Sequence, residues 1–188
     1  MNPSQNPSDI RSKKEITNTL LRLMDTYSYH DITVKQIILE AQVARKTFYR
    51  NFLSKDDVLN AHIDSIMQQY ISSLQHLPTS QLSDILDIIL NLCIQNQNLF
   101  IRLKDNNLMH LFLHKWNTFI PMMHKKIVCP NHPMFQEFSA EQIDYIIAFN
   151  IGAIWNVVMK WLENDMKDSP DTIKIILLKH LENLSIFT

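Results

Sequence analysis

Glycine is almost absent from this chain, which has one glycine in 188 residues. The loops that bind phosphate in dinucleotide and nucleoside-triphosphate sites need several glycines, so neither kind of site is expected. Alternating runs of polar and apolar residues are also few, which predicts helices and not strands. Because no Ser-His-Asp, Cys-His or paired-carboxylate arrangement can be argued, we expect neither an enzyme nor a cofactor.

Signals for export or membrane insertion are missing too. Residues 1–14 lack the apolar core of a secretory signal, and no apolar run approaches the ~20 residues that a membrane span needs. The only cysteines are Cys93 and Cys129, whose spacing does not suggest a zinc site. We expect both to be small buried apolar residues in a reducing compartment, which fits a cytoplasmic protein that does not bind membranes.

Histidine raises the question of a metal. His110 and His114 stand four residues apart on a predicted helix, with His124 and His132 further along. This spacing permits a shared metal ion. No nearby carboxylate completes a ligand set, so we expect solvated or core-edge histidines and predict no metal site.

The stretch from Thr33 to Lys55 has the pattern of a helix-turn-helix. Thr33 can cap a first helix, because Gln36 three residues later completes a capping box. Residues 42–44 would form the turn. A second helix at 45–52 then has an apolar stripe on one side, so its polar side chains project outward. Neither the turn nor the second helix contains an acidic residue, and a basic outward face suits a DNA groove.

The outward side chains divide into two predicted roles. Arg45 and Lys46 are expected to reach base edges in the major groove. Hydroxyl and ammonium groups would grip phosphates and fix the docking register. Phosphate contacts are predicted for Thr33, Thr47, Tyr49 and Lys55, while Arg50 and Asn51 could serve either role. The alternative is an ordinary amphipathic helix with a solvated basic face.

Residue types along this stretch follow the pattern of a known family. The matching positions are Thr33-Val34, Ile37, Ala41, Val43, Thr47-Phe48-Tyr49-Arg50, Phe52 and Ser54-Lys55-Asp56-Asp57-Val58-Leu59. Together they resemble the DNA-binding domain of the TetR family of bacterial transcriptional regulators, over roughly residues 9–60. Gln42 departs from the usual glycine of the turn, and Ile38 from a usual alanine. A positive φ at a non-glycine residue costs on the order of 1 kcal/mol, so we predict a turn that is mildly strained or different in shape.

The chain is predicted to have three parts. Residues 1–8 would be a disordered leader, 9–60 a helix-turn-helix DNA-binding domain, and 61–188 a helical regulatory and dimerisation domain. Residues 1–60 hold nine Lys and Arg against seven Asp and Glu, a charge of +2, so the remainder carries −3 of the total of −1. This asymmetry has the sign expected for an N-terminal nucleic-acid module.

The fold class is predicted to be all-α, with about nine helices. Expected bounds are 8 or 12 to 27, 33–41, 45–52, 54–77, 80–93, 99–104, 108–128, 139–166 and a last helix from 169. The fourth helix crosses the domain boundary, so its tilt could link the two domains. Pro121 should kink or split the seventh.

Aromatic and flexible apolar residues of the second domain are numerous enough to line a cavity. The predicted lining is Met67, Ile71, Leu90, Cys93, Phe100, Phe112, Trp116, Phe119, Met123, Tyr145, Phe149 and Trp155. Such a cavity would take a small apolar or aromatic ligand. A filled core is the alternative, and the sequence does not separate the two.

The last two helices are predicted to form a dimer interface. The helix from 139 is apolar on most sides, and Gly152 beside Ala153 in its middle suggests a close helix contact. The last helix would contribute Ile173, Ile176, Leu177, His180, Leu181 and Leu184. Two such pairs, one from each subunit, would complete a four-helix bundle.

The segment from Trp161 to Pro170 resembles, more weakly, a C-terminal variety of TetR regulators that includes activators of dihydroxyacetone kinase operons. This resemblance implies that a protein partner is an alternative to a diffusible ligand. We expect a homodimer that binds a near-palindromic double-stranded DNA operator and represses transcription until a small molecule releases it. A regulator or coactivator controlled by a protein docking on the second domain is the alternative.

Overall fold

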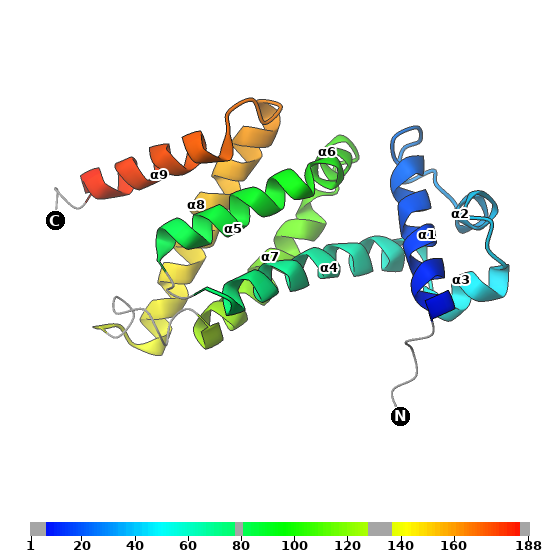
Figure 1. Cartoon of the computed structure of the whole chain (residues 1–188), viewed down its shortest axis with the longest axis horizontal. Helices are drawn as coiled ribbons and strands as arrows, with labels where there is room; N and C mark the ends of the chain where they lie inside the picture. The colour runs from blue at the N-terminus through cyan, green and yellow to red at the C-terminus, as the bar shows by residue number, and fades with distance from the viewer. Residues whose placement is uncertain (1–6, 78–80, 128–136, 185–188) are drawn as a thin grey trace. The chain divides into compact units, whose positions relative to one another are not determined.

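The computed structural model describes residues 7–77, 81–127 and 137–184, and the elements in these ranges are α-helices (Figure 1). They are α1 (Pro7–Leu23), α2 (Val34–Glu40), α3 (Arg45–Asn51), α4 (Lys55–Gln75), α5 (Leu82–Gln95), α6 (Gln97–Asp105), α7 (Met109–Ile127), α8 (Ala140–Glu163) and α9 (Pro170–Leu184). The all-α prediction is confirmed. Residues 1–6 of the predicted leader, the helix start at residue 80, Cys129 and His132 lie outside the described residues.

The chain forms two compact units. Unit 1 combines Met1–Ser65 with Ile101–Met109, and unit 2 combines Ile66–Phe100 with His110–Thr188. Helices α4 and α6 contribute residues to both units, and α7 contributes its first residue, Met109, to unit 1. The unit that holds the helix-turn-helix therefore includes a short segment from much later in the chain.

In unit 1, α1 packs against α2 and α3. It begins at Pro7, inside the predicted leader, because proline is well suited to the first turn of a helix. It ends at Leu23, before the predicted end at Tyr27, and the chain turns there as the N–H groups of Thr26 and Tyr27 both bond to the Leu23 carbonyl. The core of unit 1 includes Ile16, Leu20, Leu23, Ile32, Ile37, Phe48, Phe52, Val58, Leu59 and Ile63.

In unit 2, α5 packs against α9, and Lys174 of α9 forms an ion pair with Asp87 of α5. Helix α7 continues without a break through Pro121, so the proline does not split the helix. The core of this unit includes Ile66, Met67, Tyr70, Ile85, Leu86, Ile89, Leu90, Phe100, Phe112, Trp116, Ile120, Ile147, Ile151, Val158, Trp161 and Leu162.

Helix α8 begins with the capping box formed by Ser139 and Gln142. Among the described helices it is the one long and apolar enough to cross a membrane, by length and composition alone, which corrects the expectation that no apolar run approaches this length. One such helix is weak evidence of a span. Only 28% of its most apolar window is buried, so α8 leaves an apolar face uncovered in the single chain.

Candidate functional site

The N-terminus of α2 has the predicted capping box. Thr33 Oγ1 accepts the N–H of Gln36 at 3.2 Å, and Gln36 Oε1 accepts the N–H of Thr33 at 3.2 Å. The Thr33 hydroxyl also donates to Gln36 Oε1 at 3.3 Å. A phosphate contact from this hydroxyl would therefore have to replace a bond to Gln36.

The turn between α2 and α3 keeps the left-handed backbone that glycine adopts most easily. Gln42 has a φ of 52°. Its N–H and that of Val43 bond to the carbonyls of Leu39 and Ile38, both at 3.2 Å. The positive φ of Gln42 corresponds to the mildly strained alternative predicted for this turn, at a cost on the order of 1 kcal/mol.

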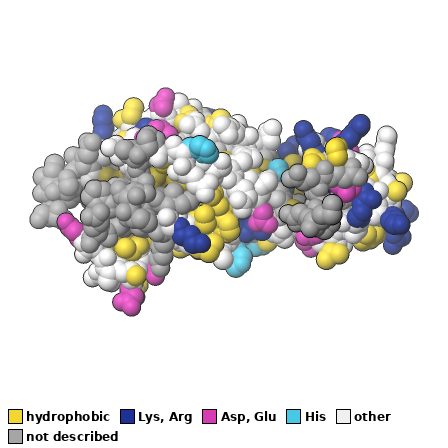
Figure 2. Space-filling model, turned by 60° about the horizontal axis from the view of Figure 1, so that its bottom comes forward, with side chains coloured by type: hydrophobic (Ala, Val, Ile, Leu, Met, Phe, Trp, Pro, Cys, Tyr) yellow, Lys and Arg dark blue, Asp and Glu magenta, His cyan; other side chains and the backbone are white. Residues whose placement is uncertain are grey.

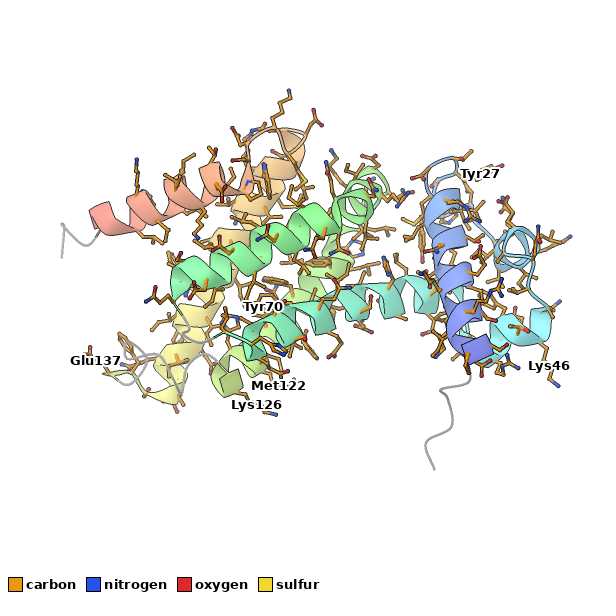
Figure 3. The ribbon with its side chains drawn as sticks, in the orientation of Figure 1. Tyr27, Lys46, Tyr70, Met122, Lys126 and Glu137 are labelled. Carbon is orange, nitrogen blue, oxygen red and sulfur yellow. The ribbon has the colours of Figure 1, made fainter. Side chains whose placement is uncertain are left out.

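Helix α3 has one buried and one outward face. Phe48 faces the core and is fully buried. Arg45, Lys46, Tyr49 and Arg50 are exposed, while Thr47 and Asn51 are half-buried. In Figure 2, Lys and Arg side chains gather over this part of unit 1, and in Figure 3 Lys46 points away from the core. The outward face of α3 thus carries the cations that the sequence placed there.

These cations differ in what holds them. The guanidinium carbon of Arg45 lies 5.6 Å from the centroid of the Tyr49 ring. Arg50 forms an ion pair with Asp9 of α1, so a DNA contact from Arg50 would require it to leave that carboxylate. Lys46 has no hydrogen bond or ion pair within the described part of the chain.

Lys55, at the start of α4, makes hydrogen bonds within unit 1. Its Nζ donates to the carbonyl oxygens of Tyr29, His30 and Ile32 at 2.6, 2.8 and 2.8 Å. An ammonium group has three donors, so all of them are used. In this conformation Lys55 holds the turn before α2, so the predicted phosphate contact would require its ammonium group to leave one of these carbonyls.

Tyr29 connects the same turn to α4. Its hydroxyl donates to Asp56 Oδ1 at 2.6 Å. Burial and the Asp56 carboxylate raise the pKa of Tyr29 well above its ordinary value, so the hydroxyl remains a donor.

The segment Ile101–Met109 also contacts this turn. Arg102 donates through Nε and Nη2 to the two carboxylate oxygens of Asp25, at 2.6 and 2.8 Å, and these bonds lower the pKa of Asp25. Asn106 Oδ1 accepts the N–H of Tyr29 at 2.7 Å. The sequence prediction missed both contacts because the partners lie 77 residues apart and isolated polar pairs have no recognisable pattern.

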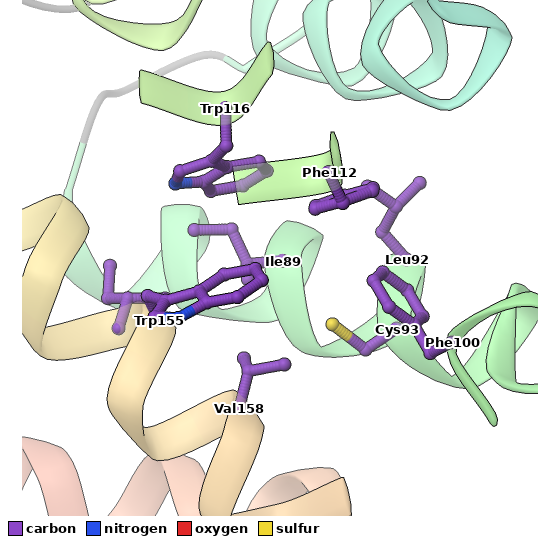
Figure 4. Close-up of a pocket in the computed structure, with 9 residues that line it drawn as sticks. Ile89, Leu92, Cys93, Phe100, Phe112, Trp116, Trp155 and Val158 are labelled. Atoms are coloured by element: carbon purple, nitrogen blue, oxygen red, sulfur yellow. The ribbon is translucent and has the colours of Figure 1, made fainter. Parts of the chain in front are cut away.

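Unit 2 contains an apolar cavity of about 20 Å3 (Figure 4). The ring centroid of Phe112 lies 5.9 Å from that of Trp116 and 6.3 Å from that of Trp155. A volume of this size holds about one water molecule and no organic ligand. The lining residues are Ile89, Leu92, Cys93, Phe100, Phe112, Trp116, Ile154, Trp155 and Val158.

The predicted pocket residues are therefore divided. Cys93, Phe100, Phe112, Trp116 and Trp155 line the cavity, while Met67, Ile71 and Leu90 are buried outside its lining and Phe119 and Met123 are half-buried. Tyr145 and Phe149 are 79% and 69% exposed, which corrects their assignment to a buried pocket. They lie two residues from the buried Ile147 and Ile151, and a step of two residues turns a helical side chain to the opposite face.

Neutral polar groups lie in the core of unit 2. The hydroxyl of Tyr70 and Nε2 of His124 are 2.6 Å apart. Burial lowers the pKa of His124 to about 4 and raises that of Tyr70 well above its ordinary value, so both are neutral at pH 7. The ring of Trp116 lies 5.3 Å from that of Tyr70, and its buried indole N–H has no acceptor among the described residues. Buried donors are normally paired, so this N–H is available to an acceptor beyond the described residues.

A more polar groove of about 500 Å3 is lined by residues of α4 and α5. Its lining is Gln69, Ser72, Ser73, Asp87, Ile88, Asn91, Leu92 and Gln95, none of which the sequence singled out. Within the described residues no group of three or more His, Cys, Asp or Glu could hold a metal.

The predicted dimer residues leave an open surface. Ile176 and Leu181 are 57% and 39% exposed, Ala153 and His180 are exposed, and Ile173 and Leu177 are half-buried; the side chain of Leu184 is not described. A Cβ built on Gly152 meets no atom within 4 Å. The predicted close contact at this glycine is therefore not made within the described chain.

A helix-turn-helix with an outward basic helix, attached to a helical second unit, defines a DNA-binding transcriptional regulator. The family description "Bacterial regulatory proteins, tetR family" matches residues 16–62, and "Transcriptional regulator C-terminal region" matches residues 80–183. The chain belongs to the TetR family of bacterial transcriptional regulators, as the resemblance had implied. The matching families are families of regulators and not of enzymes.

Solved structures with a similar fold are also regulators by title. The dihydroxyacetone kinase operon activator DhaS is 20% identical with a TM-score of 0.59, over 92% of this chain and 95% of that one. The fatty acid degradation regulator FadR from Bacillus halodurans is 17% identical with a TM-score of 0.61, over 93% and 96%. At these identities the likeness is one of fold. A search of curated protein sequences gave no match.

Proposed function

We propose that the chain is a cytoplasmic repressor that binds a near-palindromic operator as a homodimer. The observation that supports DNA binding most directly is the outward face of α3, where Arg45, Lys46 and Tyr49 are exposed with no acidic residue in the helix. Two copies of α3 would enter successive major grooves ~34 Å apart. Arg45 and Lys46 read bases, and Thr47 and Tyr49 hold phosphates.

The second copy would cover α8 and α9. Tyr145 and Phe149 on α8 and Ile176 on α9 are large apolar side chains that the single chain leaves in water. Large apolar side chains left exposed on these two helices support a proposed interaction surface there. An interface that both copies share must be self-complementary, and a pair of α-helices from each copy forms a four-helix bundle.

The signal for release would be a small, mainly apolar molecule in the aromatic core of unit 2. The indole N–H of Trp116 lies there without a partner among the described residues. The cavity of about 20 Å3 is too small for such a ligand. Binding therefore requires Phe112, Trp116 and Trp155 to move apart. The ligand would thus bind a conformation different from the one described. To swing operator occupancy from nearly full to nearly empty, the ligand must favour that conformation by ~5 kcal/mol.

Control by a docking protein is the second candidate. The small volume of the cavity favours it, because a core packed this tightly leaves no room for a ligand. The same chain would then respond to a partner on an exposed surface of unit 2.

The test is selection of bound sequences from a random DNA pool, followed by affinity measurements on the recovered site. Recovery of a palindrome at nanomolar affinity supports the dimeric operator-binding function. The Arg45→Ala change should cost ~1–3 kcal/mol and relax preference at one base pair of each half-site. Failure to recover any site would overturn the proposal.

A further inference from the structure

We propose that Tyr49 sets the base preference of the DNA-binding helix by holding the guanidinium of Arg45, in addition to gripping a phosphate with its hydroxyl. This inference rests on the proposed function, since it requires α3 to read bases. It makes Tyr49 a positioning residue for Arg45.

Helical spacing places the two side chains together. Arg45 is the first residue of α3, and Tyr49 follows four residues later on the same face. The Arg45 Cζ atom lies 5.6 Å from the ring centroid, within the ≈ 6 Å over which a cation is attracted to an aromatic face. An exposed arginine without such a contact loses considerable side-chain entropy when it is fixed on a base. The ring removes part of that loss before DNA arrives.

The ring of Tyr49 is in turn fixed by a contact with the ring of Phe48. Its centroid lies 5.4 Å from that of Phe48 with an angle of 79° between the planes, an edge-to-face arrangement. Phe48 is fully buried and its ring lies 6.2 Å from that of Phe52. A continuous aromatic path therefore runs from the core of unit 1 to the guanidinium.

The other cations of α3 are held differently, which singles out Arg45. The Arg50 guanidinium is paired with Asp9, which uses part of its donor set. Lys46 has neither an aromatic contact nor an ion pair within the described residues. A ring face leaves the N–H donors at the edge of a guanidinium free, so Arg45 alone is both oriented and available for a bidentate contact to a base.

Two functions of Tyr49 can be separated by substitution. Tyr49→Phe keeps the ring and removes the hydroxyl, whereas Tyr49→Leu removes both. If the residue only held a phosphate, the two variants would lose affinity on all sequences alike. If the ring also positions Arg45, Tyr49→Leu alone loses base discrimination.

The experiment uses the full-length protein and the operator recovered from the random pool, with each base pair varied singly. Wild type, Arg45→Ala, Tyr49→Phe, Tyr49→Leu and the double variant Arg45→Ala/Tyr49→Leu are compared. We expect Arg45→Ala to flatten preference at one base pair of each half-site. Tyr49→Leu should lower discrimination at the same base pair by roughly 2- to 5-fold, the range of an exposed cation–π contact, and Tyr49→Phe should leave it unchanged. In the Arg45→Ala background, Tyr49→Leu should have no further effect on this preference.

The readout is a ratio of affinities, so a reduced fraction of folded protein does not change it. Thermal unfolding of each variant identifies a folding failure, and Tyr49→Met replaces Tyr49→Leu if that variant does not fold. Unchanged discrimination in Tyr49→Leu, with a clear effect of Arg45→Ala, would overturn this inference while leaving the proposed function intact. An unchanged profile for Arg45→Ala would overturn the base assignment and this inference together.

Discussion

Units 1 and 2 differ in how their surfaces are completed. In unit 1 the turn before α2 is closed by internal bonds from Lys55, Arg102 and Asn106, and the outward face of α3 is polar. In unit 2 large apolar side chains such as Tyr145 and Phe149 remain in water. Unit 1 also leaves Leu39 and Leu53 65% and 81% exposed, so the units differ mainly in the partner proposed for each: a polyanion for unit 1 and further protein surface for unit 2.

The largest effect should come from an acidic residue on the open face of α8. We expect Phe149→Asp to place a charge in the proposed interface and convert the dimer to monomers, since an unpaired charge is costly to bury. Loss of the second copy of α3 from the complex should weaken operator binding on the order of 10²–10⁴-fold. Sedimentation and DNA-binding measurements check this. Met122→Asp is the matched control, because Met122 is also exposed but lies on α7 outside the proposed interface. A dimeric Phe149→Asp protein would remove the contrast between the units.

Lys55 should matter for stability and not for the salt dependence of DNA binding. We expect Lys55→Ala to lower the stability of unit 1 by about 2–3 kcal/mol, because three carbonyls lose a charged donor. The slope of log affinity against log salt should stay at its wild-type value in the folded fraction. Lys46→Ala is the control and should show the reverse, with stability kept and affinity reduced. A salt slope lowered by one unit in Lys55→Ala would restore its phosphate role.

Acid should destabilise unit 2 through His124. Its pKa falls from an ordinary value of 6.5 to about 4 on burial, so the unfolded chain binds a proton that the folded chain excludes. The contribution is fully present above pH 6.5, decreases as the pH falls from 6.5 to 4, and is lost below 4. Its size is on the order of 3 kcal/mol. Chemical unfolding at several pH values would measure it. His124→Gln should remove the dependence, while His30→Gln at an exposed site should keep it.

The smallest effect is expected at Arg102. The ion pair with Asp25 is partly exposed, so Arg102→Ala should cost only about 0.5–1 kcal/mol. Hydrogen exchange should nevertheless speed up in the turn from Asp25 to Ile32. Lys104→Ala, on the same helix, should leave that turn unchanged. Equal exchange in both variants would mean that the late segment does not support the turn.

The sequence predicted the elements built from local patterns. The capping box at Thr33 and the buried stripe through Phe48 depend on spacings of three and four residues, which the chain shows directly. Contacts between side chains that are far apart in the sequence could not be predicted. Lys55 was assigned to DNA because a lysine at a helix start can serve either a phosphate or a carbonyl, and only the folded turn decides between them.

The cavity shows the same limit. Apolar residues such as Trp116 and Tyr145 look alike in a list of aromatics, yet one is buried and the other is 79% exposed. Their difference depends on which side of each helix meets another helix. For α8 the apolar character on most sides hid the distinction, since no polar stripe marked the outer face.

The segment Ile101–Met109 of unit 1 matters for chimeras in which domains are exchanged between regulators. A chimera that joins residues up to Ser65 of this chain to a foreign second domain would lack Ile101–Met109. Asp25 would lose its Arg102 partner, and the N–H of Tyr29 would lose its acceptor on Asn106. The turn before α2 would therefore be less stable in the transferred domain. Transferring the helix-turn-helix with this turn intact would therefore take two separate pieces of chain.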